Sequence, residues 1–242
     1  MRYELEKFFS NPCEASGLLI TEAPTGYGKT YETIQAIYRY IEKGGKSQIL
    51  FITNLLKNLP EDELRSIYEQ NGRGALFKKE VLVLSSAVSN VEKVILTENI
   101  PPEFQTDAYQ ELLSACQKKK QYQQQFGEAG KDITKHIDDQ IRKKLEPQFR
   151  RELEVHLQKT FPGGPGPRRD AIRNKEKYKW MATFYPAIFW TEYKVLLLSV
   201  KKLMARNISL VEPSFDCLSE RMLKNKIVCI DEFDASRSVI LD

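Results

Sequence analysis

A glycine-rich turn, TEAPTGYGKT at residues 21–30, limits the possible folds more than any other part of the sequence. It follows the short apolar run GLLI, which predicts a buried strand. It precedes residues 29–43, where apolar side chains recur at three- and four-residue steps, which predicts a helix. Gly26 and Gly28 allow a close backbone approach and conformations closed to other residues. Strand, tight turn and helix in this order predict an α/β domain with an anion site at the helix N-terminus.

The rest of the first hundred residues continues the same alternation. SQILFIT (47–53) and VLVLSS (81–86) are short apolar runs that predict buried strands, and EDELRSIYEQ (61–70) predicts a helix with acidic residues in its first turn. Strands separated by helices favour parallel crossover connections in one sheet. The expected fold class is therefore α/β, with a mostly parallel sheet flanked by helices.

The turn has the chemistry that a polyphosphate requires. Free N–H groups at a helix N-terminus converge on an anion, and the helix dipole favours negative charge there. Lys29 is placed to reach the β- and γ-phosphates of a nucleotide, and the Thr30 hydroxyl to coordinate Mg²⁺. The expected nucleotide-binding residues are Pro24, Thr25, Gly26, Tyr27, Gly28, Lys29 and Thr30.

A magnesium–nucleotide site also needs carboxylates at the end of a neighbouring strand. KIVCIDEFD (226–234) is an apolar run that ends in acids, and it places Asp231 and Glu232 at the expected carboxyl end of a strand. Lys29 and Asp231 are expected to converge at one rim of the sheet although they are far apart in the sequence.

Together these two segments resemble a known family. Ala23 to Thr30 reads AxTGxGKT and resembles motif I of the superfamily 2 helicases and translocases, with Ala23 where the strict phosphate-loop pattern has glycine; DEFD resembles their DExD/H box. The resemblance implies a RecA-like P-loop NTPase fold. It also implies that Asp231 holds Mg²⁺, that Glu232 orients or deprotonates the hydrolytic water, and that Asp234 couples the site to neighbouring motifs.

Three further segments stand where this family contacts nucleic acid. Thr53, Asn54 and Lys57 occupy the position of motif Ia and could donate to phosphates, although an ordinary solvated turn explains them equally well. The loop after the third apolar run, 83–91, corresponds only in position and in its small hydroxyl residues. Ser199 stands near a position where the family has a hydroxyl at a helix start.

Residues 98–180 differ in character from the segments around them. They are polar and rich in Lys and Gln, which predicts a helical insertion between two parts of a RecA-like domain, residues 1–97 and 181–242. FPGGPGPRRD (161–170) is expected to be a loop because glycine and proline both oppose helix. The basic clusters 118–120, 142–144 and 168–169, with Tyr122 and Phe126, could line a nucleic-acid channel, but a solvated helical face is the favoured interpretation. His136 and His156 are expected to be surface or packing residues.

Composition excludes several classes. The 242 residues carry a net charge of +4, contain no long uncharged apolar run, and begin without a secretory signal pattern, so an intracellular protein without a membrane span is expected. Cys13, Cys116, Cys217 and Cys229 lack zinc-site spacing, and buried reduced thiols are expected.

The resemblance implies an ATP hydrolase that uses ATP and Mg²⁺ to move on or unwind DNA or RNA. The family's second RecA-like domain, with its motif III and arginine finger, is not found in these 242 residues, so incomplete catalysis is expected of this chain alone. Two alternatives stay open: a non-catalytic nucleotide- or nucleic-acid-binding module, and a P-loop phosphotransferase. The acids at the end of 226–234 favour hydrolysis over the phosphotransferase.

Overall fold

A computed structural model describes residues 2–10, 19–20, 27–127 and 130–231. The predicted buried strand GLLI lies outside these ranges except for Leu19 and Ile20, which form no strand, and Ile20 is 70% exposed. Also outside these ranges are Ala23, Pro24, Thr25, Gly26, Glu232 and Asp234. The chain divides into two compact units. Unit 1 comprises residues 1–84, 190–206 and 216–242, and unit 2 comprises residues 85–189 and 207–215.

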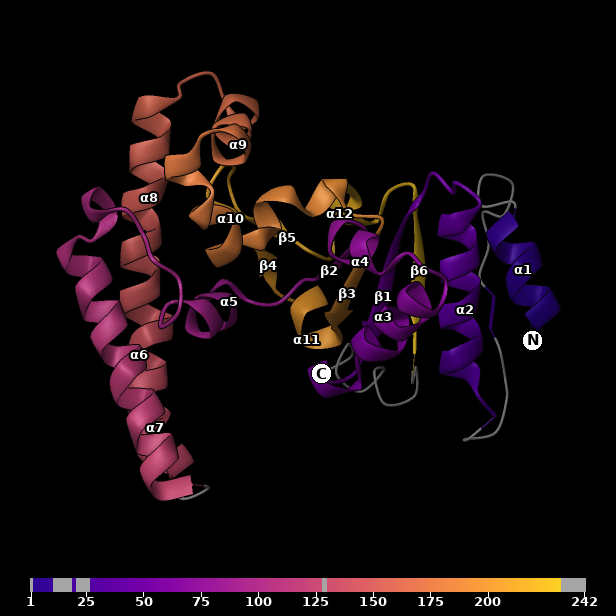
Figure 1. Cartoon of the computed structure of the whole chain (residues 1–242), viewed down its shortest axis with the longest axis horizontal. Helices are drawn as coiled ribbons and strands as arrows, with labels where there is room; N and C mark the ends of the chain where they lie inside the picture. The colour runs from indigo at the N-terminus through magenta and orange to yellow at the C-terminus, as the bar shows by residue number, and fades with distance from the viewer. Residues whose placement is uncertain (1, 11–18, 21–26, 128–129, 232–242) are drawn as a thin grey trace. The chain divides into compact units, whose positions relative to one another are not determined.

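Unit 1 is an α/β structure built on a four-stranded sheet in the order β2-β3-β1-β6 (Figure 1). All three strand pairs are parallel, which confirms the α/β class and the parallel sheet predicted from the sequence. The strands are β1 (Gln48–Thr53), β2 (Val81–Val83), β3 (Val195–Ser199) and β6 (Lys226–Ile230). The helices are α1 (Arg2–Ser10), α2 (Lys29–Glu42), η1 (Leu56–Asn58), α3 (Glu61–Gln70), α4 (Gly74–Glu80), α11 (Val200–Leu203) and α12 (Glu220–Leu223).

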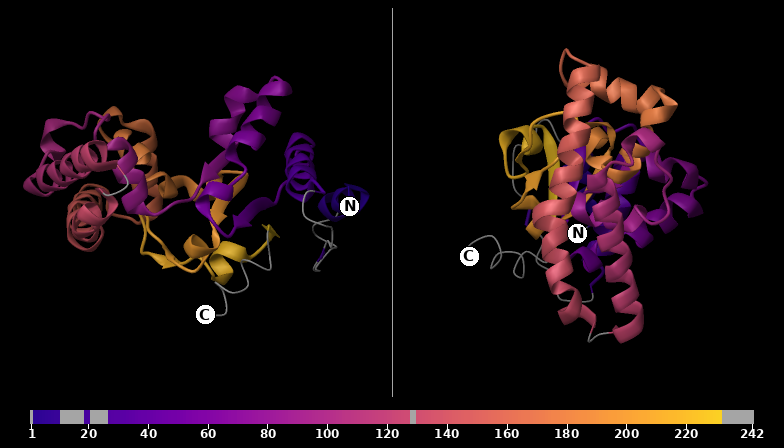
Figure 2. Two further views of the ribbon diagram at one scale, coloured as in Figure 1. Left: turned by 90° about the horizontal axis from the view of Figure 1, so that it is seen from below. Right: turned by 90° about the vertical axis from the view of Figure 1, so that its left-hand side faces the viewer.

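The central strands of unit 1 are buried on both faces. In β1, Ile49 and Phe51 join a core formed with the apolar faces of α1 to α4, and these helices lie together on one face of the sheet (Figure 2, left). Leu50 and Ile52 point to the opposite face and are fully buried as well. Burial on both faces is typical of parallel sheets, and it explains why β1 and β3 read as unbroken apolar runs.

Unit 2 is helical. Its long helices α6 and α8 run side by side (Figures 1 and 2), and a short π-helical segment, η4, joins α7 to α8. Its elements are α5 (Ala87–Val94), η2 (Pro102–Phe104), α6 (Asp107–Phe126), α7 (Gly130–Gln140), η4 (Ile141–Leu145), α8 (Glu146–Thr160), α9 (Pro165–Asn174), η5 (Glu176–Tyr178) and α10 (Trp180–Phe184). Three further elements lie where the chain passes from one unit to the other: η6 (Pro186–Glu192) and a two-stranded ladder of β4 (Arg206–Asn207) and β5 (Phe215–Asp216).

An aromatic cluster forms the centre of unit 2. Phe149 is fully buried, and its ring lies 5.4 Å from Tyr109, 6.3 Å from Trp180 and 6.5 Å from Phe184, measured between ring centroids. Leu210 and Val211 belong to the same core, although the chain returns to unit 2 only after passing through unit 1. Unit 2 therefore depends on both of its segments.

Several element boundaries differ from those predicted. The segment 161–170 was predicted to be a loop, but α9 begins at Pro165. A proline at the first helical position lacks only an N–H that has no helical partner there, so it starts a helix rather than breaking it. The third strand ends at Val83 instead of residue 86, and β6 ends at Ile230, before the acids.

Unit 2 contains the whole of the predicted insertion, 98–180, and extends beyond it on both sides. The assignment of the units to a RecA-like domain and an insertion stays a prediction. Among the helices in the described ranges, none combines the length and the apolar character needed to cross a membrane.

Candidate active site

The glycine-rich turn enters α2 through a left-handed residue. Gly28 has φ 74° and ψ 23°, a conformation that strains any residue with a side chain, although a Cβ at this position would meet no atom within 4 Å. Glycine is therefore required by the backbone rather than by space. The Glu32 N–H donates to the Gly28 carbonyl at 2.9 Å, which closes the first turn of the helix. Gly28 supplies no side-chain cap to the N–H groups at the start of the helix.

Two predicted ligands of one cation lie in direct contact. The Thr30 hydroxyl donates a hydrogen bond to the Asp231 carboxylate at 2.6 Å, across 201 positions of sequence. Both side chains are partly buried. The expected convergence of the glycine-rich turn and the acidic strand end is thus present in the structure at Thr30 and Asp231.

The sheet explains how these residues meet. β6 pairs in parallel with β1 from Gln48 to Ile52, and the Asp231 N–H continues this ladder by donating to the Ile52 carbonyl at 2.9 Å. Asp231 is therefore fixed at the carboxyl end of the sheet. Helix α2 packs its buried apolar face into the core above the same strands, which holds Thr30 beside that end.

The oxygen pair fits a small divalent cation. Mg²⁺ prefers oxygen ligands, usually keeps several waters, and takes only one or two carboxylates from a protein. The Thr30 hydroxyl gives its hydrogen to Asp231, so its lone pairs stay available to a cation. No cluster of three or more His, Cys, Asp or Glu side chains exists within the described part of the chain. A cation here would therefore rely on Thr30, Asp231, water and a phosphate.

Lys29 and Tyr27 flank this pair. Lys29 is the first residue of α2 and is half-buried, and Tyr27 is 69% exposed before the helix. Of the predicted site residues, the structure places Tyr27, Gly28, Lys29, Thr30 and Asp231 at one end of unit 1. The predictions for Pro24, Thr25, Gly26 and Glu232 lie outside the described residues.

Cys229 lies two residues before Asp231 on β6. Burial raises the pKa of its thiol to about 12, and the neighbouring Asp231 charge acts in the same direction. A raised pKa favours the neutral thiol over the reactive thiolate. Cys116 and Cys217 are free and buried, as expected from the sequence, whereas Cys229 is free but only half-buried. Cys13 lies outside the described residues.

The segments predicted to contact nucleic acid in unit 1 are partly engaged within the fold. The Thr53 hydroxyl is buried and donates to the Leu55 carbonyl at 2.8 Å, so it is not directed at an outside phosphate. Lys57 is exposed and Asn54 is half-buried on the same turn. Ser199 is buried and caps α11 by accepting from the Lys202 N–H at 3.2 Å, which makes it a structural residue.

The basic clusters of unit 2 are also divided between structural and exposed members. Arg168 donates to the Val211 carbonyl at 3.1 Å, and Arg169 donates to the Ile188 carbonyl at 3.0 Å, so both hold unit 2 together. Lys119 pairs with Glu92 at 2.7 Å. A continuous channel lined by all three clusters is therefore not formed.

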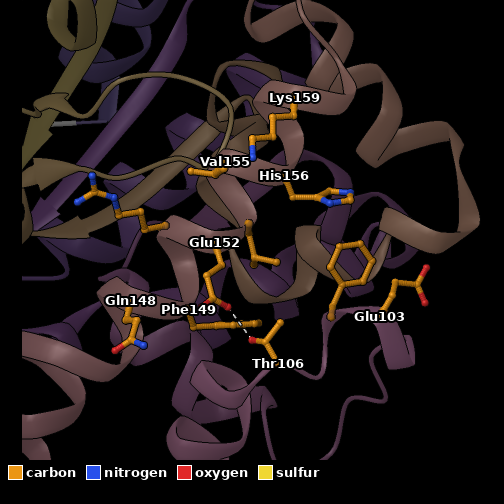
Figure 3. A pocket seen from close by; sticks show the side chains of 11 residues that line it. Glu103, Thr106, Gln148, Phe149, Glu152, Val155, His156 and Lys159 are labelled. Atoms are coloured by element: carbon orange, nitrogen blue, oxygen red, sulfur yellow. Dashed lines mark hydrogen bonds between the residues drawn. The ribbon is translucent and has the colours of Figure 1, made fainter.

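Unit 2 also carries an open groove of about 570 Å³ along α8, beside the segment of η2 (Figure 3). Its floor is Phe149 and Leu153, and at its edge the Thr106 hydroxyl donates to the Glu152 carboxylate at 2.6 Å. His156 packs edge-on against Phe104, and burial lowers its pKa. No local pattern predicts this groove, because its walls come from segments that are distant in the sequence.

Comparisons with known proteins add no assignment. No protein-family model matches this chain, and no curated protein matches it either.

Proposed function

We propose that unit 1 is the ATP-binding domain of a superfamily 2 helicase or translocase, with a RecA-like P-loop fold and DNA or RNA as the partner. The observation that carries the proposal is the 2.6 Å hydrogen bond from Thr30 to Asp231, because it joins the two sequence motifs at the carboxyl end of a parallel sheet. Ligands of open α/β sheets bind outside this end of the strands.

Each residue has a distinct part in the proposed site. The N–H groups at the start of α2 and the Lys29 ammonium bind the β- and γ-phosphates of ATP. Thr30 and Asp231 hold Mg²⁺, which neutralises the charge that develops on the phosphates. By the family resemblance, Glu232 holds the hydrolytic water and accepts its proton.

Nucleotide binding tests the proposal directly. We expect Mg²⁺-dependent binding of fluorescent ATP by the full chain, and loss of this binding in Lys29→Ala because the phosphates lose their only side-chain cation in motif I. Lys43→Ala is the matched control, since Lys43 is an exposed lysine at the other end of the same helix. Equal affinity of wild type and Lys29→Ala would refute the assignment.

Turnover separates an enzyme from a binding module. Glu232→Gln is expected to retain ATP binding and to abolish any ATP hydrolysis, because the amide cannot accept the proton of the water. Hydrolysis by the wild-type chain that single-stranded DNA or RNA stimulates would exclude the non-catalytic alternative. Transfer of phosphate to an acceptor other than water would favour the phosphotransferase.

A further inference from the structure

The positive charge of the chain is concentrated in one segment of unit 2. Residues 117–145 contain eight Lys or Arg and four Asp or Glu, a formal charge of +4, which equals the net charge of the whole sequence. The remaining positions carry 29 basic and 29 acidic residues and balance to zero. The segment forms the end of α6, then α7 and η4, and it lies at the end of unit 2 remote from α9 and α10 (Figures 1 and 2).

Most basic side chains of this segment are not used to hold the fold. Lys119 is the main exception: it bridges Glu92 at 2.7 Å and Asp138 at 2.5 Å and is largely buried, so it ties α6 to its neighbours. Lys143 pairs with Asp139 on its own helix at 2.9 Å. Five others are exposed and form no ion pair with a described residue: Lys118, Lys120, Lys135, Arg142 and Lys144.

Two aromatic rings are exposed beside these charges. Tyr122 and Phe126 are 37% and 43% exposed, and their ring centroids lie 6.2 Å apart with 35° between the planes. Lys118, Tyr122 and Phe126 follow one another at four-residue steps, so they form one stripe along α6. Every residue from 120 to 127 is exposed, and α6 has no acidic residue after Glu111.

We propose that the basic arm, defined as residues 117–127 and 134–145, binds single-stranded nucleic acid. Exposed planar rings provide stacking surfaces for unpaired bases, and exposed lysines in a segment of net positive charge attract the phosphate backbone. In this arrangement bases stack on Tyr122 and Phe126, while Lys118 contacts the backbone along the same stripe. The ion pair between Lys119 and Asp138 aligns α6 with α7. Lys135, three residues before Asp138, therefore lies at about the level of Tyr122, three residues after Lys119, and provides a second phosphate contact.

The groove along α8 lacks these properties. Two acidic residues balance two basic residues among those that line it, which are Glu103, Glu152, Arg151 and Lys159. The groove is otherwise mostly apolar, so it offers no net positive field to a polyanion. The basic arm is therefore the part of unit 2 that matches a nucleic acid in charge and in chemistry. The inference deepens the proposed function, from which it takes the class of partner, and it assigns the contact to a different unit from the nucleotide.

The test measures binding of a fluorescent 20-nucleotide single strand to the full chain at several salt concentrations, without ATP. DNA and RNA strands of one composition are compared, together with the corresponding duplex. Lys118→Gln with Lys120→Gln is expected to weaken binding. It should also reduce the slope of log K against log salt by roughly 0.7 for each phosphate that the lysines no longer neutralise. Tyr122→Leu with Phe126→Leu is expected to weaken binding by about fivefold or more without changing the salt slope.

Lys78→Gln with Lys79→Gln is the matched control, since these are two adjacent exposed lysines on α4 in unit 1. Circular dichroism reports whether each variant keeps its helices. Arm variants that keep wild-type affinity overturn the proposal. The proposal is also overturned if polyglutamate competes as well as an unlabelled oligonucleotide and the aromatic substitutions have no effect, because the arm then binds any polyanion.

The two proposals fail independently. If the wild-type chain binds the oligonucleotide but not ATP, and the arm variants lose the oligonucleotide, the nucleotide site is refuted and the arm is supported. A chain that binds ATP through Lys29, but whose arm variants hold the oligonucleotide like wild type, gives the reverse result.

Discussion

The two units place their candidate sites differently. In unit 1 the inner residues of β1 and β3 are apolar, and polar side chains stand at the strand ends, with Thr30 meeting Asp231 at the carboxyl end of the sheet. Unit 1 also buries one carboxylate, Glu80, which pairs with Lys194 at 2.8 Å. Unit 2 likewise buries an ionic group: Glu146 is 1% exposed and pairs with Arg150 at 3.0 Å. The unneutralised charge of unit 2 lies on the surface of the basic arm.

This contrast indicates where a site can form in each unit. Parallel strands end together, so the residues that follow them share one edge and can form a site without disturbing the core. A helical bundle has no such edge, and its buried charges are neutralised by each other, as Arg150 is by Glu146 and Glu154. Buried charges in unit 2 therefore serve to hold the fold, and exposed charges are available to bind a partner.

A substitution in one core should separate the two units most clearly. Phe149→Ala removes a fully buried ring from unit 2 and is expected to cost about 3–5 kcal/mol of its unfolding free energy. Each unit contains one of the two tryptophans, Trp180 in unit 2 and Trp190 in unit 1. Urea unfolding followed by Trp180 fluorescence, in a Trp190→Phe background, should shift to lower urea.

The same Phe149→Ala change should leave ATP binding by unit 1 intact at low urea. The reciprocal variant, Phe51→Ala in β1, should mainly shift the transition reported by Trp190 in a Trp180→Phe background. Equal shifts of both reporters in both variants would show a single cooperative structure and would contradict the division into two units.

A more modest change is expected at the edge of the sheet. Thr30→Val removes the hydrogen bond to Asp231 and is expected to cost about 1 kcal/mol of stability. It should also raise the Mg²⁺ concentration needed for ATP binding, because the cation has one protein ligand fewer. Thr33→Val is the control in the same helix, since Thr33 donates only to the Lys29 carbonyl. If both variants had the same Mg²⁺ requirement, Thr30 would have no role in holding the cation.

The smallest expected effect is the pH dependence of the stability of unit 2. Burial raises the pKa of Glu146, against the opposing influence of Arg150. A raised pKa means that the folded state binds the proton more tightly than the unfolded state. The contribution of this group to stability is therefore full below the ordinary glutamate pKa and is lost as the pH rises through the raised value.

Glu146→Gln should remove this loss, so the stability of the variant relative to wild type should increase with pH above about 4.5. Urea midpoints from about pH 4 to pH 8, read from Trp180, measure the trend across the range in which a raised glutamate pKa would lie. A difference that stays flat, or that falls with rising pH, would mean that the ion pair with Arg150 outweighs the cost of burial.

The sequence predicted the parts of the fold whose signals are local. Residues 61–70 form the expected helix, and residues 48–53 form the expected strand, because apolar periodicity depends on neighbours in the chain. The helix that starts at Pro165 was missed because the same prolines that break a helix interior also begin one. The paired motifs predicted that Lys29 and Asp231 converge at one rim of the sheet. The direct contact is between Thr30 and Asp231, and its geometry comes from the pairing of β6 with β1.

The use of each charge could not be predicted from sequence. Lys118, Lys119 and Lys120 are identical in type and adjacent, yet Lys119 alone is held between Glu92 and Asp138. Arg168 and Arg169 donate to carbonyls that are distant in the sequence. These partners are set by the packing of separate segments, which leaves no local pattern.

Strand order bears on how the protein is made. Both neighbours of β1 in the sheet, β3 and β6, follow the long helical segment in the chain, since β3 begins at Val195. During translation β1 is synthesised first, and neither of its neighbours exists until that segment has left the ribosome. The exposed apolar edges of β1 are thus a hazard for the nascent chain, and rapid folding of the helices between β2 and β3 would shorten the time for which a chaperone has to cover them.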